Sequence, residues 1–115
     1  MTALETAVRV IVDLLARGEF ATIDRMTGGR RLSANDMREA VEEYGRTLCG
    51  VGATWWDTVV VTPVTRARSG AGRQFHVAAP LWTAEEGLSD LSVEIELTEV
   101  GPEVFRPAIL DLHVL

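Results

Sequence analysis

Apolar and polar side chains alternate at helical spacing over about residues 3–17. The apolar positions are Leu4, Ala7, Val8, Ile11, Val12, Leu14 and Leu15. Charged residues fall mostly on the other side, so the pattern predicts an amphipathic helix that ends at Gly18. A second, short helix is predicted from about Phe20, because Phe20, Ile23 and Met26 lie three apart before a pair of glycines.

A third helix is predicted to begin at Ser33, a residue type that caps helix N-termini well. Asp36 follows three residues later, where a capping box usually has Glu or Gln, so the box is imperfect. Leu32 and Met37 are placed to pack against each other around this cap. The expected buried stripe is Met37, Ala40, Val41 and Tyr44.

After about residue 50 the period of the pattern changes to two, which is typical of β-strands. A first strand is predicted over about residues 57–64, and Pro63 should lie near its end or at a sheet edge. Three more strands are predicted over residues 74–83, 91–98 and 104–115. Residues 65–73, with Arg66, Arg68 and Arg73, are expected to form a solvated hairpin loop.

The strand over residues 91–98 has the clearest alternation, with one apolar face and a polar face that carries Glu94 and Glu96. In the last strand, Ile109, Asp111 and His113 are predicted to share the face opposite to the core. The strands are expected to contribute to the core Phe75, Val77, Leu81, Val93, Ile95, Leu97, Leu110, Leu112 and Val114.

Helices followed by strands with short turns indicate an α+β fold with an antiparallel sheet. We therefore predict that residues 1–115 form a single domain, with N-terminal helices packed on one face of a four-stranded antiparallel sheet. A one-residue slip would move Glu94 and Glu96 into the core, so the strand register should be strongly fixed.

The order of these elements resembles the nuclear-transport-factor-2-like (NTF2-like), or SnoaL-like, superfamily. That resemblance implies a cone in which a curved sheet cups the helices, often around an apolar pocket. The segments RLSANDMREAVEEYGRTL, LWTAEEGLSDLSVEIEL and LDLHVL also resemble a bacterial domain family without an assigned function. Small acidic domains of this kind are similar to immunity proteins, which neutralise a toxin made by the same bacterium.

The net charge of −6 disfavours nucleic acid or an anionic membrane as the main partner, and it suits a basic partner protein. Cys49 is the single cysteine, so an internal disulfide is impossible, which fits a reducing compartment. No stretch approaches the roughly 20 apolar residues that span a bilayer. We therefore expect a cytoplasmic protein, and homodimerisation is left open.

An acidic surface is predicted around the turn between the second and third long strands. Its carboxylates, together with an aromatic side chain that could anchor an interface, are Trp82, Glu85, Glu86, Asp90, Glu94 and Glu96. A patch of this kind accelerates encounter with a basic partner. We expect these residues to bind that partner, although acidic pairs are also common on an ordinary solvated sheet face.

Catalysis is the alternative, and its candidate residues are His76, Asp111 and His113. Asp111 and His113 project from the same strand face, and with His76 they could form an acid–base group. No nucleophile is fixed beside them, and no HExxH or CxxC pattern is present, so we expect neither catalytic residues nor a metal or cofactor.

Two functions therefore fit the sequence. The first is a non-enzymatic protein-binding domain, most simply an immunity protein that occludes its cognate toxin. The second is a SnoaL-like protein or enzyme that takes a small molecule inside the cone. The two histidines and Asp111 should distinguish them, because convergence on a deep pocket lined by tryptophan would favour the enzyme.

Overall fold

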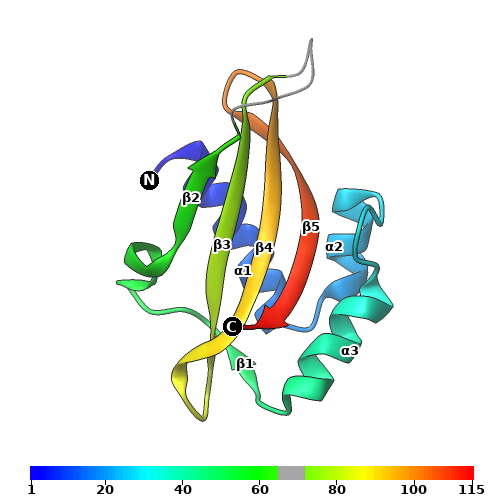
Figure 1. Cartoon of the computed structure of the whole chain (residues 1–115), viewed down its shortest axis with the longest axis vertical. Helices are drawn as coiled ribbons and strands as arrows, with labels where there is room; N and C mark the ends of the chain where they lie inside the picture. Colours follow the sequence, from blue (N-terminus) through cyan, green and yellow to red (C-terminus); the bar gives the residue numbers. More distant parts are fainter. Residues whose placement is uncertain (65–71) are drawn as a thin grey trace.

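Three helices precede the strands along the chain (Figure 1). The structure, a computed structural model, describes residues 1–64 and 72–115. The predicted loop with Arg66 and Arg68 therefore lies largely outside the described residues. The elements are α1 (Ala3–Ala16), α2 (Phe20–Thr27), α3 (Ala34–Tyr44), β1 (Leu48–Cys49), the 3-10 helix η1 (Trp55–Thr58), β2 (Val60–Pro63), β3 (Gln74–Thr83), β4 (Gly87–Gly101) and β5 (Val104–Val114).

The helices begin and end as their sequences predict. The Thr2 side chain accepts a hydrogen bond from the backbone N–H of Glu5 and so caps α1. At the start of α3, Ser33 and Asp36 form a complete capping box, with each side chain accepting from the backbone N–H of the other. The shorter Asp36 side chain therefore performs the role that Glu or Gln usually performs.

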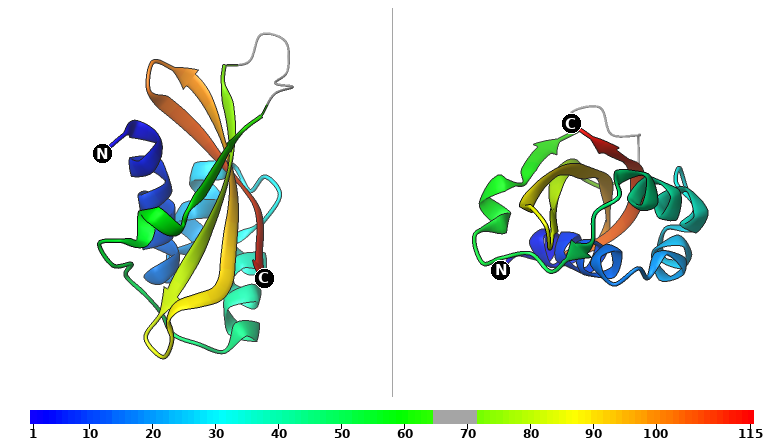
Figure 2. Two further views of the ribbon diagram at one scale, coloured as in Figure 1. Left: turned by 60° about the vertical axis from the view of Figure 1, so that its left-hand side comes forward. Right: turned by 90° about the horizontal axis from the view of Figure 1, so that it is seen from below.

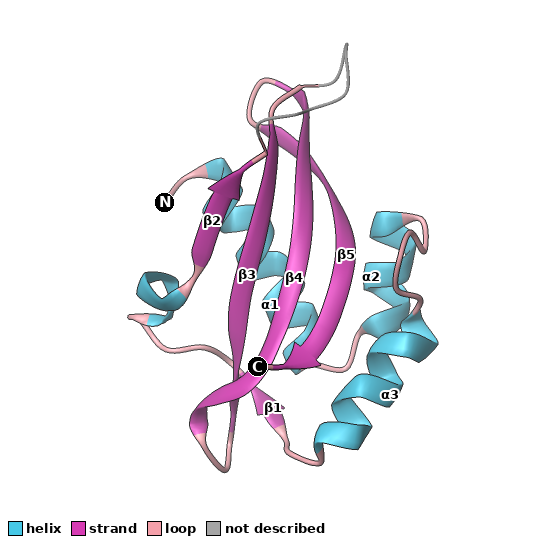
Figure 3. Ribbon diagram, in the orientation of Figure 1, coloured by secondary structure: helices cyan, strands magenta, loops and turns pink. Residues whose placement is uncertain are grey.

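Within the described residues, five strands form one antiparallel sheet. β4 lies between β3 and β5, while β1 and β2 pair with different parts of the remaining edge of β3. Figure 2 shows from two further sides that α1 lies against one face of this sheet, and Figure 3 shows α2 and α3 beside β5. The α+β fold is confirmed, and the structure adds β1 to the four predicted strands.

The core fills the space between the sheet and the helices. Alternate residues of β4 point into it, and Val93, Ile95 and Leu97 are completely buried. Their partners from the helices include Ile11 and Leu15. The predicted burial of one face of the 91–98 strand is therefore confirmed, and Glu94 and Glu96 lie on the other face as expected. We call this other face the outer face of the sheet.

The segment before β2 differs from the prediction of a strand over 57–64. Residues 55–58 form η1 instead, and the strand begins at Val60. The indole of Trp55 is fully buried and its Nε1 donates to the carbonyl oxygen of Pro80 at 2.6 Å. The Thr58 hydroxyl donates to the Trp55 carbonyl oxygen, which stabilises the turn that inserts this ring. Pro63 lies at the end of β2, as predicted.

The faces of β5 were predicted incorrectly for part of the strand. Glu94 is opposite Asp111, but the next residue of β4, Ile95, is opposite Ile109, so Leu110 is an extra residue in a β-bulge. The bulge changes the phase of the alternation. Ile109 is therefore completely buried, whereas Leu110 is only half-buried.

Two further residues of the predicted core also lie elsewhere. Val114, near the end of β5, is 55% exposed, because it lines an open groove beside α3. Phe75, at the start of β3, is half-buried and packs edge-on against Phe105. The other predicted core residues of the strands are buried.

The connection between α2 and α3 lies against the outside edge of β5. Arg30 donates from Nη2 to the carbonyl oxygen of Pro107 at 3.1 Å. Arg31, which has a positive φ of 72°, forms an isolated parallel bridge with Ile109. This edge of the sheet is therefore occupied near its bulge by another part of the same chain.

Candidate functional site

Four titratable side chains converge on the outer face, and we call them the imidazole–carboxylate cluster: His76, Glu94, Asp111 and His113. They come from the three longest strands, with Glu94 of β4 between His76 of β3 and the two residues of β5. The register places Glu94 directly opposite Asp111, and Ser92 directly opposite His113. The sheet pairing therefore fixes the backbone positions of the cluster.

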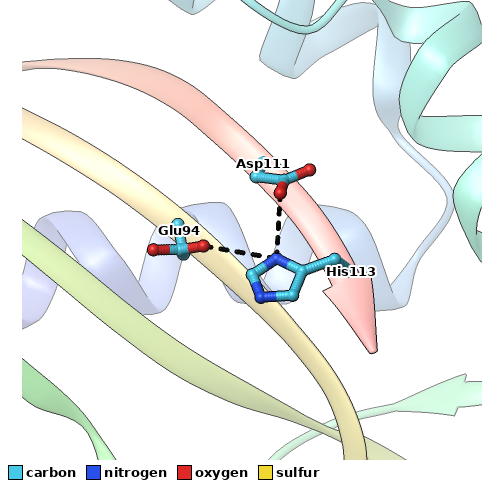
Figure 4. A group of neighbouring side chains, drawn as sticks. All are labelled: Glu94, Asp111 and His113. Atoms are coloured by element: carbon cyan, nitrogen blue, oxygen red, sulfur yellow. Dashed lines mark ion pairs between the residues drawn. The ribbon is translucent and has the colours of Figure 1, made fainter. Parts of the chain in front are cut away.

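Glu94 is the centre of the cluster because each of its oxygens faces a different imidazole. Oε1 lies 2.8 Å from Nε2 of His76, and Oε2 lies 3.3 Å from Nδ1 of His113. The Nδ1 atom of His113 is also 3.1 Å from Oδ2 of Asp111 (Figure 4). One nitrogen thus faces two carboxylates.

The contacts of His113 Nδ1 are close but are not hydrogen bonds. This atom is enclosed, and it has no hydrogen-bond partner of suitable geometry among the described residues. Asp111, by contrast, is held in place by its own strand, since Oδ1 accepts from the backbone N–H of Leu112 at 2.9 Å. Its other oxygen is therefore directed towards the imidazole of His113.

The cluster is open to solvent rather than enclosed. Exposed fractions are 28% for the side chain of Glu94, 34% for each imidazole and 55% for Asp111. A groove of about 400 Å³ lies between α3 and the ends of β4 and β5, and His113 contributes to its wall. Its lining includes neither His76 nor Asp111, and no tryptophan. The two histidines and Asp111 thus do converge, but they meet on an open sheet face.

Residues 12–115 match the family described as "Domain of unknown function (DUF7668)". The chain belongs to this family. The match begins within α1 and includes every strand and all four residues of the cluster. No curated protein and no solved structure matches the chain significantly. The NTF2-like and immunity-protein resemblances therefore stay predictions. None of the helices in the described ranges is long and apolar enough to cross a membrane.

Two of the six residues predicted to bind a partner also connect parts of the DUF7668 domain to one another. Glu85 accepts from both the backbone N–H and the hydroxyl of Thr47, at 2.8 and 2.9 Å. Glu86 accepts from the hydroxyl of Tyr44, at 2.7 Å to its nearer oxygen, and from Nε of Arg46 at 3.1 Å. The turn between β3 and β4 is thereby attached to the segment that follows α3.

These hydrogen bonds shift the pKa values of the groups involved. Donation from the backbone and hydroxyl of Thr47 lowers the pKa of Glu85. The hydrogen bond to Glu86 raises the pKa of Tyr44, because loss of the phenolic proton would place two negative charges side by side. Both effects favour the form that makes the contact at neutral pH.

We expect Glu85→Gln to lower the melting temperature at about pH 7 and to have a smaller effect at about pH 3. The folded-state pKa of Glu85 is lowered, so its stabilising contribution is present above the ordinary glutamate range and is lost as the pH falls through the folded-state pKa. Thermal unfolding followed by circular dichroism at both pH values measures the difference. An equal destabilisation at both values would contradict a role for the charge.

The remaining predicted partner-binding residues lie on or beside the outer face. Asp90 and Glu96 project from β4, and Asp90 is exposed whereas Glu96 is half-buried. Trp82 is half-buried, with its ring so close to Gly52 that a Cβ atom there would lie 2.6 Å from it. It is directly opposite Leu88, which is 50% exposed. An aromatic and an aliphatic side chain thus adjoin the acidic face.

The sequence alone did not predict that Glu94, a residue of the acidic surface, would contact the candidate catalytic residues. Glu94 was assigned to the acidic surface, and His76, Asp111 and His113 to a possible acid–base group. The alternation of each strand correctly placed all four side chains outward. Their contact depends on how far each strand is shifted along its neighbour, which the alternation of a single strand does not contain.

Proposed function

We propose that the domain is a non-enzymatic protein-binding module that docks a basic partner protein on the outer face of its sheet. The observation that supports this most directly is the charge of that face. Among the described residues of β3, β4 and β5, the outward positions include four carboxylates and one guanidinium: Asp90, Glu94, Glu96, Asp111 and Arg106.

The outer face also has the mixed chemistry of an interface. Ala78, Pro80 and Trp82 alternate along β3 on this side, and Val60 of β2 is 60% exposed beside Ala78. Apolar side chains would supply most of the buried area of a complex, while the carboxylates around them would select a partner of opposite charge. Because the helices cover only the other face, a partner has access to the sheet (Figure 1).

The open position of the cluster supports binding over catalysis. Catalytic acids and bases generally act in a site that positions the substrate and excludes water. Here Asp111 is more than half exposed. The groove near His113 does not include the other two candidate catalytic residues. In the most specific form of the proposal, the domain acts in the cytoplasm as an immunity protein, and it neutralises a cognate toxin by covering its surface.

Co-expression with the product of the adjacent open reading frame tests the proposal. We expect the two proteins to co-purify, and the domain to restore growth when that product is toxic. The double variant Asp90→Lys with Glu96→Lys should slow association at least about tenfold, because steering by opposite charges is reversed. Neither residue belongs to the imidazole–carboxylate cluster, so this variant leaves the cluster intact.

Glu39→Lys with Glu42→Lys is the matched control, since it changes the net charge equally and both residues are exposed carboxylates on α3 rather than on the sheet. This variant should associate at the unmodified rate apart from a small effect of total charge. Equal slowing by the control and the double variant would show that the outer face has no specific role. Absence of both binding and protection with every neighbouring gene product would remove the immunity proposal.

A further inference from the structure

Three atoms of the imidazole–carboxylate cluster are arranged like the ligands of a metal ion. One ligand atom each from Glu94, Asp111 and His113 lies within 4.8 Å of the other two. Nδ1 of His113 is 3.3 Å from Oε2 of Glu94 and 3.1 Å from Oδ2 of Asp111. Such distances also occur in ordinary ion pairs, so distance alone does not distinguish a metal site from an ion pair.

The two separations from Nδ1 of His113 agree with the edges of a coordination tetrahedron, whereas the two carboxylate oxygens are known only to lie within 4.8 Å of each other. Zinc bound by histidine nitrogen and carboxylate oxygen has bonds of about 2.0–2.2 Å, and two ligands on a tetrahedron of that size are about 3.3–3.5 Å apart. The two distances from Nδ1 are at or slightly below this value. Nδ1 of His113 therefore lies at ligand–ligand distance from both carboxylates.

His113 also has a ring nitrogen that is available to bind a metal ion. Its Nδ1 is enclosed and has no hydrogen-bond partner of suitable geometry in the described part of the chain, although two carboxylates face it. A buried polar atom without a partner is costly, and a bound ion would remove that cost. The unpartnered nitrogen is therefore a second observation that points to the same position.

Both carboxylates are oriented by groups outside the ligand set. Asp111 Oδ1 accepts from the backbone N–H of Leu112, so that Oδ2 faces His113. Nε2 of His76 lies 2.8 Å from Glu94 Oε1, which leaves Oε2 for the third ligand position. Partners of this kind fix the direction of metal ligands and commonly change affinity by about 10–100-fold.

We propose that Glu94, Asp111 and His113 bind a divalent transition-metal ion of the zinc type, with His76 as a positioning residue. Two carboxylates balance the charge of a divalent ion, and the imidazole favours zinc and related ions over magnesium and calcium, which prefer oxygen ligands. Three protein ligands leave a fourth position open to water or to an external ligand. The proposal is independent of protein docking, since it concerns the isolated chain.

Calorimetric titration of the EDTA-treated protein with Zn²⁺ is the direct test. We expect one ion per chain at micromolar concentrations, and no comparable binding of Mg²⁺. Titration with Co²⁺ gives a second readout, because tetrahedral Co²⁺ absorbs visible light much more strongly than octahedral Co²⁺. Absence of stoichiometric Zn²⁺ binding, or binding that Mg²⁺ matches, would overturn the proposal.

Variants then show whether the ion is at this position. Asp111→Asn keeps an oxygen that can accept from the backbone N–H of Leu112 but removes the negative charge. His113→Ala removes the Nδ1 ligand atom. Each variant should weaken Zn²⁺ binding at least about 100-fold. His76→Gln should weaken it about 10–100-fold without changing the stoichiometry. Glu96→Gln is the control on the same strand face and should leave the affinity nearly unchanged. Circular dichroism in EDTA establishes that each variant is folded.

Equal Zn²⁺ affinity in His113→Ala and the unmodified protein would place the ion elsewhere and overturn the assignment. If His113→Ala does not fold, unchanged Zn²⁺ affinity in Asp111→Asn would overturn the assignment in the same way, because this replacement preserves the shape of the side chain. A Glu96→Gln variant that loses affinity as strongly as Asp111→Asn would indicate diffuse attraction by the acidic face rather than a built site.

Discussion

Replacement of Ile109 by Asp should lower the free energy of unfolding by at least about 4 kcal/mol, whereas the same replacement at Leu110 should cost about 1 kcal/mol. Ile109 is completely buried, because the bulge turns it towards the helices. A carboxylate there would lose its hydration without gaining a partner. Leu110 is the extra residue of the bulge and is only half-buried, so a charged side chain there keeps contact with water.

Urea denaturation followed by far-ultraviolet circular dichroism measures both variants. Ile109→Asp is expected to be largely unfolded without denaturant, since the predicted loss approaches the whole stability of many small domains. Ile109→Ala gives a measurable intermediate case, with an expected loss of about 2–5 kcal/mol. The opposite ranking of positions 109 and 110 would mean that β5 lacks the bulge and follows simple alternation.

Replacement of Trp55 by Ala should lower the free energy of unfolding by about 3–5 kcal/mol. The ring of Trp55 is fully buried and is among the largest completely enclosed side chains. Its removal would leave a cavity and would also leave the carbonyl oxygen of Pro80 without the donor that now lies 2.6 Å away. The guanidinium of Arg9, 5.3 Å from the ring centroid, would lose a cation–π contact as well.

Trp56→Ala is the matched control, because it removes the same type of side chain from the neighbouring, half-buried position. It should cost less than half as much as Trp55→Ala. The midpoint of urea denaturation, measured by circular dichroism rather than by tryptophan fluorescence, allows direct comparison of the two. Similar losses for both variants would contradict the assignment of Trp55 as the aromatic centre of the core.

The boundaries of the helices could be predicted because their signals are local. Gly18, Gly28 and Ser33 act within a few residues of their own position, and the structure has helix ends at each. The faces of β4 were also predictable, because its alternation is uninterrupted through the core. The error in β5 arose from the bulge, which depends on pairing with β4. Ile109 and Leu110 are both apolar, so the sequence does not indicate which of the two is buried.

The residues of the candidate site could be predicted from the sequence, but their contacts across the strands could not. Sequence patterns placed Asp111 and His113 together on one strand face, but they did not indicate that Glu94 of the neighbouring strand would join them. That meeting requires the specific register between β4 and β5. A motif search could not find it either, because the ligands come from two strands separated by a turn rather than from one short segment.

The contact of Arg30 and Arg31 with β5 has a consequence for self-association. An unprotected edge strand offers its backbone groups to any other extended chain, which is a common origin of aggregation. Here the connection after α2 occupies that position through the bonds to Pro107 and Ile109, and the nearby bulge makes the edge irregular. Continuation of the sheet into a second copy is therefore obstructed at this border, and the chain itself supplies the segment that protects it.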